Sequence, residues 1–587
     1  MQSQVEPNLS YFIAKARSIE GRTFQKKIKV AILSSFTING LEEALRVKCA
    51  ESEITCLTYI CGYGQYNQDI LDQSSKLYEF SPEITFVIID TRTVMSTLFY
   101  SPYAIPVNDR RSYIDKRVAD FVNLIRTFKN RTDSKLVLTN CSIPTYSPYG
   151  ICEGKSEYGL REMVYDFNAK LSDVFRSDPQ VFLFDFNSFV SKYGEVNVLD
   201  YRQFLVGDIK VSLSHIPHLA EEMMGYVKAN MGINRKCIVL DLDNTLWGGI
   251  IGEDGFVRID LSLKPPGTAF VEFQRMLLAL YQRGIILAIN SRNNEDEALR
   301  AIREHPYMVL REENFATMKI NWRDKISNMK EIAEELNIGL ESIVYFDDDP
   351  INRELMSKAI PQIMTVDLPD DPSLYASTLM RINDFNTLAV TSEDRNRGEM
   401  YRQERRRSEL KNSASNLEEF LKQLEINVTM KKANDFTIPR IAQLTLKTNQ
   451  FNLTTRRYQE EDVQKFAHDQ TKLIGCAQTK DKFGDNGITG VYIVNKNHAD
   501  KEWYIDTFLL SCRVMGRGIE EVMLGYILSK AKEEGVERVK AEFIPTKKNK
   551  PCEQLLPNFG FKKEGQQWVY TYHVPIKQTT HIELNED

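Results

Sequence analysis

Two aspartates at the end of an apolar segment are the residues of this chain best suited to chemistry. The stretch 237–255 reads CIVLDLDNTLWGGIIGEDG, and Asp241 and Asp243 follow the apolar run Ile238–Leu240. Carboxylates two positions apart on a strand point the same way, and two like charges held together are unfavourable unless a cation or a proton lies between them. The pattern predicts a cation or proton site at a strand end. The alternative is an Asp-rich turn after a core strand.

Further polar positions follow in an order that fits one site. Ser291 ends a second apolar strand expected over 284–290, and its hydroxyl suits a hydrogen bond to a transferring phosphoryl group. Lys325 opens an amphipathic helix, where its charge adds to the helix dipole for binding an anion. A third strand, 342–346, ends in three aspartates, 347–349. Each feature alone has a plainer explanation: a strand-end hydroxyl, a solvated lysine, a helix cap. Their order favours a single site.

The order DxDxT, strand-Ser, Lys, strand-DD resembles the four motifs of the haloacid dehalogenase (HAD) phosphotransferases. The resemblance implies that Asp241 attacks phosphorus to give an aspartyl-phosphate and that Asp243 is the general acid and base. It implies that Ser291 and Lys325 hold the equatorial phosphoryl oxygens. It also implies bound Mg²⁺. The metal ligands would be Asp241, Asp243 through its backbone carbonyl, and Asp347 or Asp348, with the choice between the last two left open.

Neither gap between these motifs has room for the cap domain that closes many HAD sites. About 40 residues separate Asp243 from the next strand, and they include a helix expected over 270–283. Only 33 residues lie between Ser291 and Lys325. We therefore expect an open site, covered only by a flap over 247–255. An open site suits a large substrate, such as a small group carried on another protein.

Longer motifs narrow the resemblance to the FkbH-like branch of the HAD enzymes. They are LWGGIIGEDG, NWRDK, FDDDP and, outside the HAD segment, KTNQFNLTTRRY at 447–458. The resemblance runs from about Lys27 to Val574. It implies a polyketide-type pathway in which a glyceryl unit from 1,3-bisphosphoglycerate is loaded on an acyl carrier protein as a thioester, with phosphate release. One position departs from the family: Asn352 stands where an acid usually follows the Pro of DDxP, which affects the surroundings of the metal.

The C-terminal third carries a glycine-rich turn between a strand expected over 503–510 and a helix over 519–534. Glycines let the backbone approach phosphates, and N–H groups at a helix start bind them. With a later strand over 538–544, the segment resembles the acyl-CoA pyrophosphate loop of GNAT acyltransferases. That implies coenzyme A, or the phosphopantetheine arm of a carrier, bound at Arg513, Gly516 and Gly518. The alternative is an ordinary strand-to-helix turn, and no catalytic base is evident.

The N-terminal part alternates apolar strands, expected over 28–33, 84–90 and 135–139, with helical stretches. This alternation predicts a doubly wound parallel sheet. It resembles the SGNH hydrolase fold, with Asn140 near that family's Asn block. GDS is missing, however, and Ser212-x-x-His215 stands where Asp-x-x-His is expected. Ser35 and His215 could form a dyad, but a non-catalytic role in docking a carrier is favoured.

Two cysteines are candidates for holding an acyl group as a thioester before the carrier arm receives it. Cys512 lies beside the glycine-rich turn. Cys237 lies four residues before Asp241, about 13 Å along a strand, which weakens its case. Most cysteines at such positions are small core residues.

The composition fits a multidomain enzyme of the cytoplasm. The 587 residues suffice for roughly three to four domains, and a net charge of -6 is too mild to indicate nucleic acid as a partner. We see no signal peptide and no apolar run long enough for a membrane span, so no membrane association is expected. Nine cysteines without zinc spacing indicate reduced thiols.

Together these features predict a multidomain α/β protein with doubly wound parallel sheets and a C-terminal α+β domain. The expected parts are an SGNH-like domain over 1–230, a capless HAD domain over 231–392, a charged helical linker over 393–420 and a GNAT-like domain over 421–578. The linker contains Arg405–Arg407, expected as a solvated helix face or a contact for an acidic carrier. The favoured function is glyceryl transfer from a small phosphorylated acyl donor to an acyl carrier protein. The alternatives are a Mg²⁺-dependent phosphatase of a carrier- or sugar-linked phosphate, and a carrier-docking assembly protein.

Overall fold

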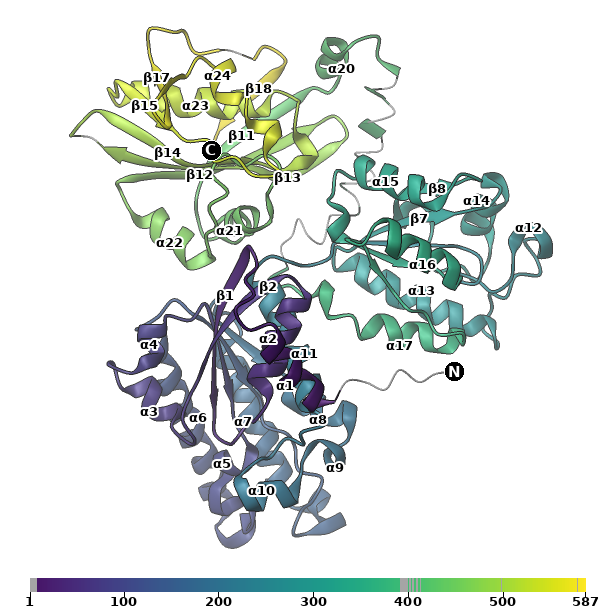
Figure 1. Ribbon diagram of the computed structural model, residues 1–587, viewed down its shortest axis with the longest axis vertical. Helices are drawn as coiled ribbons and strands as arrows, with labels where there is room; N and C mark the ends of the chain where they lie inside the picture. Colours follow the sequence, from purple (N-terminus) through teal and green to yellow (C-terminus); the bar gives the residue numbers. More distant parts are fainter. Residues whose placement is uncertain are drawn as a thin grey trace. The chain divides into compact units, whose positions relative to one another are not determined.

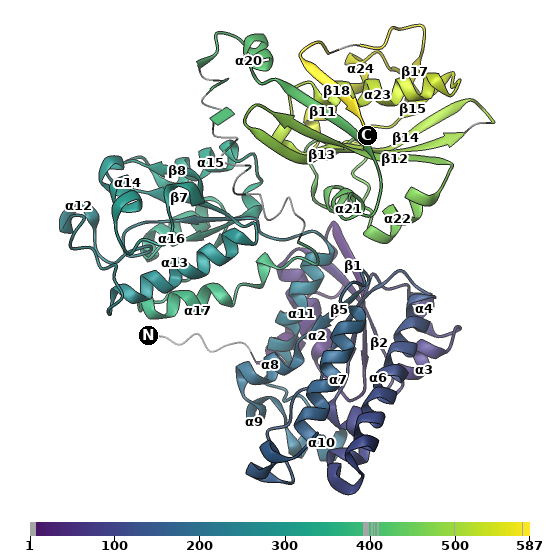
Figure 2. The ribbon, with the colours of Figure 1, turned by 180° about the vertical axis from the view of Figure 1, so that it is seen from behind.

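The computed structural model describes residues 8–390, 398, 400, 403, 406–407, 410–411, 413–497, 499–577 and 579–587. The chain divides into two compact units, Met1–Met231 and Gly232–Asp587. Among these described residues, the first unit contains one β-sheet and the second contains two (Figures 1 and 2). No helix among the described residues is long and apolar enough to cross a membrane.

The first unit is a five-stranded parallel sheet with helices on both faces, as the alternating sequence pattern predicts. Its strand order is β2-β1-β3-β4-β5, and every neighbouring pair is parallel. Helices α6 and α7 pack on one face through a shared apolar core, and α1, α2 and α11 contact one another on the other (Figure 2). The elements are β1 (Lys26–Ser34), β2 (Ile54–Ile60), β3 (Ile84–Ile88), β4 (Lys135–Thr139), β5 (Val181–Phe184), α1 (Leu9–Ser18), α2 (Leu41–Glu51), α6 (Val107–Lys129), α7 (Leu160–Phe175) and α11 (Ile216–Asn230).

The second unit begins with another parallel sheet, ordered β10-β9-β6-β7-β8. Its central strands are buried on both faces, which explains their continuous apolar runs. Helices α13, α14 and α17 share one apolar core with the sheet, and α15 and α16 share another. The elements are β6 (Cys237–Leu240), β7 (Ile286–Ser291), β8 (Phe315–Ile320), β9 (Ile343–Phe346), β10 (Met364–Thr365), α12 (Ile251–Asp254), α13 (Gly267–Gln282), α14 (Glu295–Glu304), α15 (Lys325–Glu335), α16 (Pro350–Ala359) and α17 (Tyr375–Met380).

A mixed eight-stranded sheet, ordered β16-β17-β15-β14-β13-β12-β11-β18, forms the C-terminal part. Its only parallel pairs are β14–β15 and β11–β18. Helix α23 packs in one apolar core with the sheet, and α21 and α22 in another. The elements are β11 (Ile426–Lys432), β12 (Lys472–Asp481), β13 (Gly484–Asn497), β14 (Glu502–Leu510), β15 (Arg538–Ala541), β16 (Lys562–Glu564), β17 (Gln567–Thr571), β18 (Ile582–Glu586), α21 (Ile438–Lys447), α22 (Glu460–His468) and α23 (Ile519–Glu533). The predicted α/β fold class is confirmed.

Two expectations about the C-terminal part of the chain need correction. The predicted end of the last domain at 578 leaves out β18, a five-residue strand that pairs with β11 and is exposed after Ile582. Of the 28 residues of the predicted linker over 393–420, thirteen lie outside the described residues, and Arg405 of its basic run is among them. Arg407 is described, and it is no solvated side chain: it is 1% exposed and forms an ion pair with Asp481 of β12, with an Nε–Oδ2 distance of 2.6 Å.

The expected flap over 247–255 is also wrong at its start. Trp247 is fully buried in the apolar core, because its indole N–H finds a partner in the carboxylate of Asp243. Only Ile251–Asp254 of the segment forms a short surface helix, α12. Between Asp243 and Lys325, all of which is described, the remaining elements belong to the sheet and its covering helices. This stretch contains no separate cap domain.

Candidate active site

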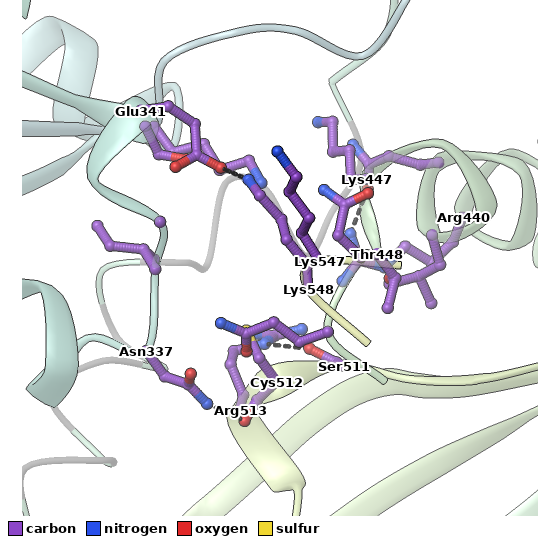
Figure 3. A pocket seen from close by; sticks show the side chains of 18 residues that line it. Asn337, Glu341, Arg440, Lys447, Thr448, Ser511, Cys512, Arg513, Lys547 and Lys548 are labelled. Carbon is purple, nitrogen blue, oxygen red and sulfur yellow. Dashed lines mark hydrogen bonds and ion pairs between the residues drawn. The ribbon is translucent and has the colours of Figure 1, made fainter. Parts of the chain in front are cut away.

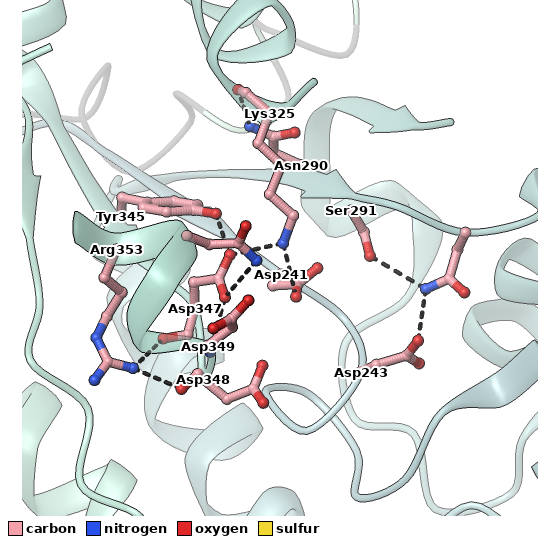
Figure 4. Close-up of polar contacts among 12 residues, drawn as sticks. Asp241, Asp243, Asn290, Ser291, Lys325, Tyr345, Asp347, Asp348, Asp349 and Arg353 are labelled. Atoms are coloured by element: carbon pink, nitrogen blue, oxygen red, sulfur yellow. Dashed lines mark hydrogen bonds and ion pairs between the residues drawn. The ribbon is translucent and has the colours of Figure 1, made fainter. Parts of the chain in front are cut away.

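The order of the second unit's parallel sheet explains why residues far apart in sequence meet. Strand β6 lies between β9 and β7, all parallel, so their carboxyl ends share one edge. Asp241 follows β6, Ser291 ends β7, and Asp347 and Asp348 follow β9. Ligands of open α/β sheets bind outside this edge. Figure 4 shows these side chains together, as the sequence pattern predicts.

A buried lysine joins two of the carboxylates. The amine of Lys325 lies 2.8 Å from Oδ2 of Asp241 and 2.6 Å from Oδ2 of Asp347. The side chain of Lys325 is 6% exposed and that of Asp347 is fully buried. Burial alone would lower the pKa of Lys325, but the charges of Asp241 and Asp347 outweigh it and raise the pKa. Lys325 is therefore charged and balances part of the negative charge of the site.

The three acids leave a place for a cation. Oxygens of Asp241, Asp347 and Asp348 lie within 4.8 Å of one another. Oδ1 of Asp241 is buried and accepts no hydrogen bond from any described residue. Burial, with the charge of Asp347 adding to it, raises the pKa of Asp241 although Lys325 opposes the shift. An orphaned buried carboxylate oxygen beside two further carboxylates fits Mg²⁺, a hard cation with oxygen ligands. Both Asp347 and Asp348 belong to this group.

The carboxylate of Asp243 is held apart from that group by three hydrogen-bond donors. Its Oδ1 accepts from the indole N–H of Trp247 at 2.9 Å and from the backbone N–H of Ile251 at 3.1 Å. Its Oδ2 accepts from Nδ2 of Asn293 at 3.0 Å, and the same amide donates to Oγ of Ser291 at 3.2 Å (Figure 4). This arrangement suits an acid–base residue in a fixed position, and it leaves only the backbone of Asp243 to the metal.

Several residues around Asp347 were not singled out in the sequence. The hydroxyl of Tyr345 donates to Oδ2 of Asp347, and Arg353 donates to the backbone oxygens of Asp347 and Asp348 at 2.9 and 2.6 Å. Asn352, the departure from the family pattern, places Nδ2 3.4 Å from Oδ1 of Asp347. An amide therefore serves as a weak donor where an acid would add a fourth negative charge. Of these residues, Arg353 could have been predicted from the sequence, because it lies one helix turn after the Asp triplet and so near the backbone of Asp347 and Asp348.

The site predicts a pH-dependent affinity for Mg²⁺. Burial, then the charges of Asp241 and Asp347, raises the pKa of Asp348 to about 6. In the metal-free protein the resulting destabilisation is fully present above that pH. It begins to shrink as the pH falls through about 6 and Asp348 takes up a proton in the folded chain, and it is gone below the ordinary aspartate pKa of about 3.9. Since Mg²⁺ must displace this proton, its apparent affinity should fall about tenfold per pH unit below 6.

Thermal unfolding at increasing Mg²⁺ concentrations, at about pH 7.5 and pH 5.5, measures this dependence. The Asp348→Asn variant is the control, because it has no proton to displace and should show a flatter pH dependence. Equal Mg²⁺ stabilisation of the unsubstituted chain at both pH values would contradict the assignment of Asp348.

The two candidate acyl-bearing cysteines lie in different surroundings. Cys237 is fully buried within β6, and burial raises the pKa of its thiol. A buried, protonated thiol cannot meet a substrate, so the structure argues against an acyl-thioester at Cys237. Cys512 is partly exposed, and burial of its sulfur again raises the pKa of the thiol. No described group makes Cys512 a ready thiolate, so its role remains a prediction.

The glycine-rich turn before α23 fits a diphosphate poorly. Gly516 and Gly518 have φ of 72° and 87°, as such a turn requires. A Cβ at Gly518 would meet His581 and Thr579 of the C-terminal segment at 3.2 Å, and the ring of His581 is hydrogen-bonded to the backbone oxygen of Arg517. The first turn of α23 also carries Glu520 and Glu521. The start of the helix is thus covered by the chain itself and carries negative charge, which disfavours a phosphate there.

Arg513, the third residue of this predicted coenzyme site, lies away from the start of α23. Its Nε donates to Oγ of Ser511 at 3.3 Å, and with Cys512 it lines a pocket of about 420 Å³ (Figure 3). The three residues predicted for coenzyme A or phosphopantetheine therefore do not converge on one cradle.

In the first unit, the predicted polar residues serve local structure. Oγ of Ser35, just after β1, accepts from the backbone N–H of Asp90 at 3.1 Å. Nδ1 of His215 lies 3.0 Å from Oγ of Ser214. The amide of Asn140 donates to Asp185 at 2.8 Å, at the start of α8 (Phe186–Tyr193). These contacts fit the favoured non-catalytic interpretation.

Comparisons with known proteins agree with this geometry. Residues 29–228 match the family model described as FkbH, N-terminal domain. A solved structure of the N-terminal part of the protein BF1531 from Bacteroides fragilis, containing a phosphatase domain complexed with Mg, is 26% identical with a TM-score of 0.60. That similarity covers 65% of this chain and 100% of the other. The curated proteins contain no significant match.

The C-terminal part shows only weak similarities. A spermidine N-acetyltransferase variant from Vibrio cholerae is 13% identical over 24% of this chain and 93% of its own, with a TM-score of 0.20. A GNAT-family acetyltransferase from Desulfovibrio desulfuricans is 12% identical over 24% and 96%, also with a TM-score of 0.20. These values support no functional argument. The N-terminal match and the assembled motifs are more informative: residues 29–228 match the FkbH N-terminal family, and the second unit brings together the motifs that resemble those of the HAD superfamily.

Proposed function

We propose that the chain is a Mg²⁺-dependent HAD-type phosphotransferase that removes phosphate from 1,3-bisphosphoglycerate and loads the glyceryl group on an acyl carrier protein. One observation carries the phosphotransfer part: Asp241 has one oxygen on Lys325 and the other buried without a partner, among three carboxylates. Bound at Asp241, Asp347, Asp348 and the backbone of Asp243, Mg²⁺ would neutralise the phosphoryl oxygens and the acids.

The residues of the chain divide the phosphoryl transfer between them. A carboxylate oxygen of Asp241 attacks phosphorus, the bond from phosphorus to the ester oxygen breaks, and Asp243 gives that oxygen a proton. Asp243 then takes a proton from the water that attacks the aspartyl-phosphate, which restores Asp241 and releases phosphate. Lys325 and Ser291 hold phosphoryl oxygens during both steps. Asn293 and Trp247 keep the carboxylate of Asp243 in place.

The carrier-linked part of the proposal rests on how openly the site can be reached by a substrate attached to another protein. No cap domain lies among residues 232–390, all of which the structure describes, so a group on a bulky carrier can reach the carboxyl edge of the sheet. In the acyl step, the thiol of the carrier arm attacks the acyl carbon, the carbon–oxygen bond to the acyl phosphate breaks, and phosphate leaves. The thiol proton passes to solvent. On this proposal the enzyme accepts a substrate attached to a bulky carrier, whereas capped HAD phosphatases act on small metabolites.

Intact-protein mass spectrometry of a carrier in its phosphopantetheine form tests the proposal directly. The carrier is incubated with the chain, Mg²⁺ and 1,3-bisphosphoglycerate, while free phosphate is assayed. We expect a mass gain of one glyceryl group that requires Asp241. Phosphate release without loading would favour a plain phosphatase, the function that the phosphatase domain of the Bacteroides fragilis protein suggests. Absence of both signals would contradict the proposed donor.

A further inference from the structure

A strongly cationic pocket lies in the second unit, away from the aspartates of the HAD site. Its volume is about 420 Å³ (Figure 3). Six basic side chains line it, and a single carboxylate, that of Glu341, is also present. The basic residues are Lys236, Arg440, Lys447, Arg513, Lys547 and Lys548. Because like charges gathered in a concave site repel one another and focus a positive potential, such a pocket attracts an anion.

The C-terminal sheet domain supplies five of the six cations from three separate segments. Arg440, Gln443 and Lys447 are spaced i, i+3, i+7 on α21, which places them on one face of that helix. Arg513 follows β14, and Lys547 and Lys548 lie in the loop after β15. In Figure 3, Lys547 and Lys548 project from the same stretch of chain toward the interior of the pocket. The convergence is a property of this domain's own fold.

Neighbouring contacts give the pocket a defined wall. Lys447, Asn449 and Gln450 belong to the KTNQFNLTTRRY motif, which the HAD chemistry does not use. Arg457 of that motif fixes the turn by donating to the backbone oxygens of Thr445 and Leu446. Nδ2 of Asn337 donates to the backbone oxygen of Cys512 at 2.6 Å. The motif therefore has a structural reason to carry its basic and amide side chains: it forms one side of this pocket.

The side-chain oxygen of Gln450 is buried and has no hydrogen-bond partner among the described residues. A hydroxyl or amide N–H of a ligand could satisfy it. The volume accommodates a small organic molecule rather than a polymer. Lys548 forms an ion pair with Glu341, the one acid of the lining, so the lining as a whole keeps an excess of positive charge. That excess favours phosphate groups, because phosphate oxygens accept charge-assisted hydrogen bonds from both lysine and arginine.

We propose that this pocket binds a small phosphate ester carrying at least two negative charges. The start of α23, where the sequence predicts a diphosphate, is covered by the C-terminal segment, and Arg513 instead contributes to the cationic pocket. The shared chemistry is a diphosphate or a pair of phosphates. Its source is either a nucleotide thiol such as coenzyme A or a small phosphorylated metabolite. This inference stands apart from the proposed phosphotransfer at Asp241.

Calorimetric titration of the full chain with inorganic diphosphate and with coenzyme A tests the proposal. A chelator is present, so that the HAD site cannot hold phosphate through a metal ion. We expect saturable binding of at least one probe that weakens as salt rises. The double variant Lys447→Gln, Lys547→Gln should bind about tenfold more weakly or worse, because each lysine contributes a charged hydrogen bond. The control Lys532→Gln removes an exposed lysine of α23 outside the pocket and should bind normally.

Each outcome decides something. Tighter binding of coenzyme A than of diphosphate, lost in the double variant, supports a nucleotide thiol as the ligand. Binding of diphosphate alone, lost in the same variant, supports a phosphorylated metabolite. Saturation by neither probe overturns the proposal, and so does binding that the double variant leaves unchanged. Binding of a carrier protein without binding of either probe also overturns it, since the surface would then recognise a macromolecule rather than a phosphate ester.

Discussion

The Asp241→Asn variant should release phosphate about 10⁴-fold more slowly than the unsubstituted chain, or not at all. An amide is a far weaker nucleophile than a carboxylate, so the aspartyl-phosphate cannot form at a useful rate. The substitution also removes one of the three acids grouped for Mg²⁺. The loss should therefore persist at high Mg²⁺ concentration, and a phosphate-release assay at increasing Mg²⁺ measures it.

The matched control for this prediction is Asp370→Asn, which removes an exposed aspartate of the same domain. It should keep full activity. Folding of the Asp241→Asn protein is checked by its thermal unfolding, which should stay cooperative because the amide conserves the size of the side chain. Phosphate release at the normal rate by Asp241→Asn would contradict both the phosphotransferase and the plain phosphatase interpretations.

Lys325→Met should affect stability more than any other single substitution at the site. Removing one partner of a buried charge cluster leaves the carboxylates of Asp241 and Asp347 uncompensated, which costs about 3–5 kcal/mol. In a domain of this size the loss lowers the midpoint of thermal unfolding by about 10 °C. Mg²⁺ should restore part of it, because a divalent cation supplies positive charge to the same acids.

The matched control is Lys330→Met, which removes an exposed lysine of the same helix, α15. Its unfolding midpoint should change little, because exposed lysines contribute little to stability. Activity of Lys325→Met should stay low even where Mg²⁺ restores stability, since the phosphoryl group loses a charged partner. A Lys325→Met protein as stable as the Lys330→Met protein without metal would show that Lys325 does not balance the buried acids.

The sequence predicted those parts of the site that follow from local pattern. Strand β6 is recognisable because Ile238–Leu240 is continuously apolar and the acids come directly after it. Adjacent parallel strands then place Ser291 and Asp347 beside Asp241 without any further information. Lys325 was predictable for a related reason, because it is the first residue of an amphipathic helix that packs on the same sheet.

Contacts between distant segments were not predictable in this way. Arg407 reads as part of a solvated basic run, yet it is buried because Asp481, 74 residues later, pairs with it. Trp247 reads as part of a flap, yet its indole N–H completes the surroundings of Asp243 in the core. Asn293 is one polar residue among several after β7, and only the folded chain shows that it donates to Asp243. In each case a partner outside the local segment decides whether a polar side chain is buried.

The glycine-rich turn illustrates the opposite error, a local pattern whose surroundings do not suit the expected ligand. Its positive φ angles are those of a phosphate loop. The covering residues, Thr579 and His581, lie some sixty residues further along the chain, in a segment without a strong pattern of its own. The cationic pocket could not be predicted from the sequence either, because its lysines and arginines come from distant segments that meet only in the folded chain.

The most direct test of the central claim is a search for the phosphoryl group on Asp241 itself. The Asp243→Asn variant lacks both the acid that protonates a leaving alkoxide and the base that activates water. The acyl phosphate of 1,3-bisphosphoglycerate has a carboxylate leaving group that needs no proton, so Asp241 can still accept its phosphoryl group, and the aspartyl-phosphate should accumulate when the variant is mixed with Mg²⁺ and this donor. Peptide mass spectrometry after an acid quench should find one added phosphoryl group on the peptide containing Asp241. The Asp241→Asn, Asp243→Asn double variant should show none. The contradicting result has two parts. The unsubstituted chain releases phosphate, but the Asp243→Asn protein carries no phosphoryl group on Asp241, whether it is sampled during the first turnover or at steady state. Asp241 would then not be the nucleophile.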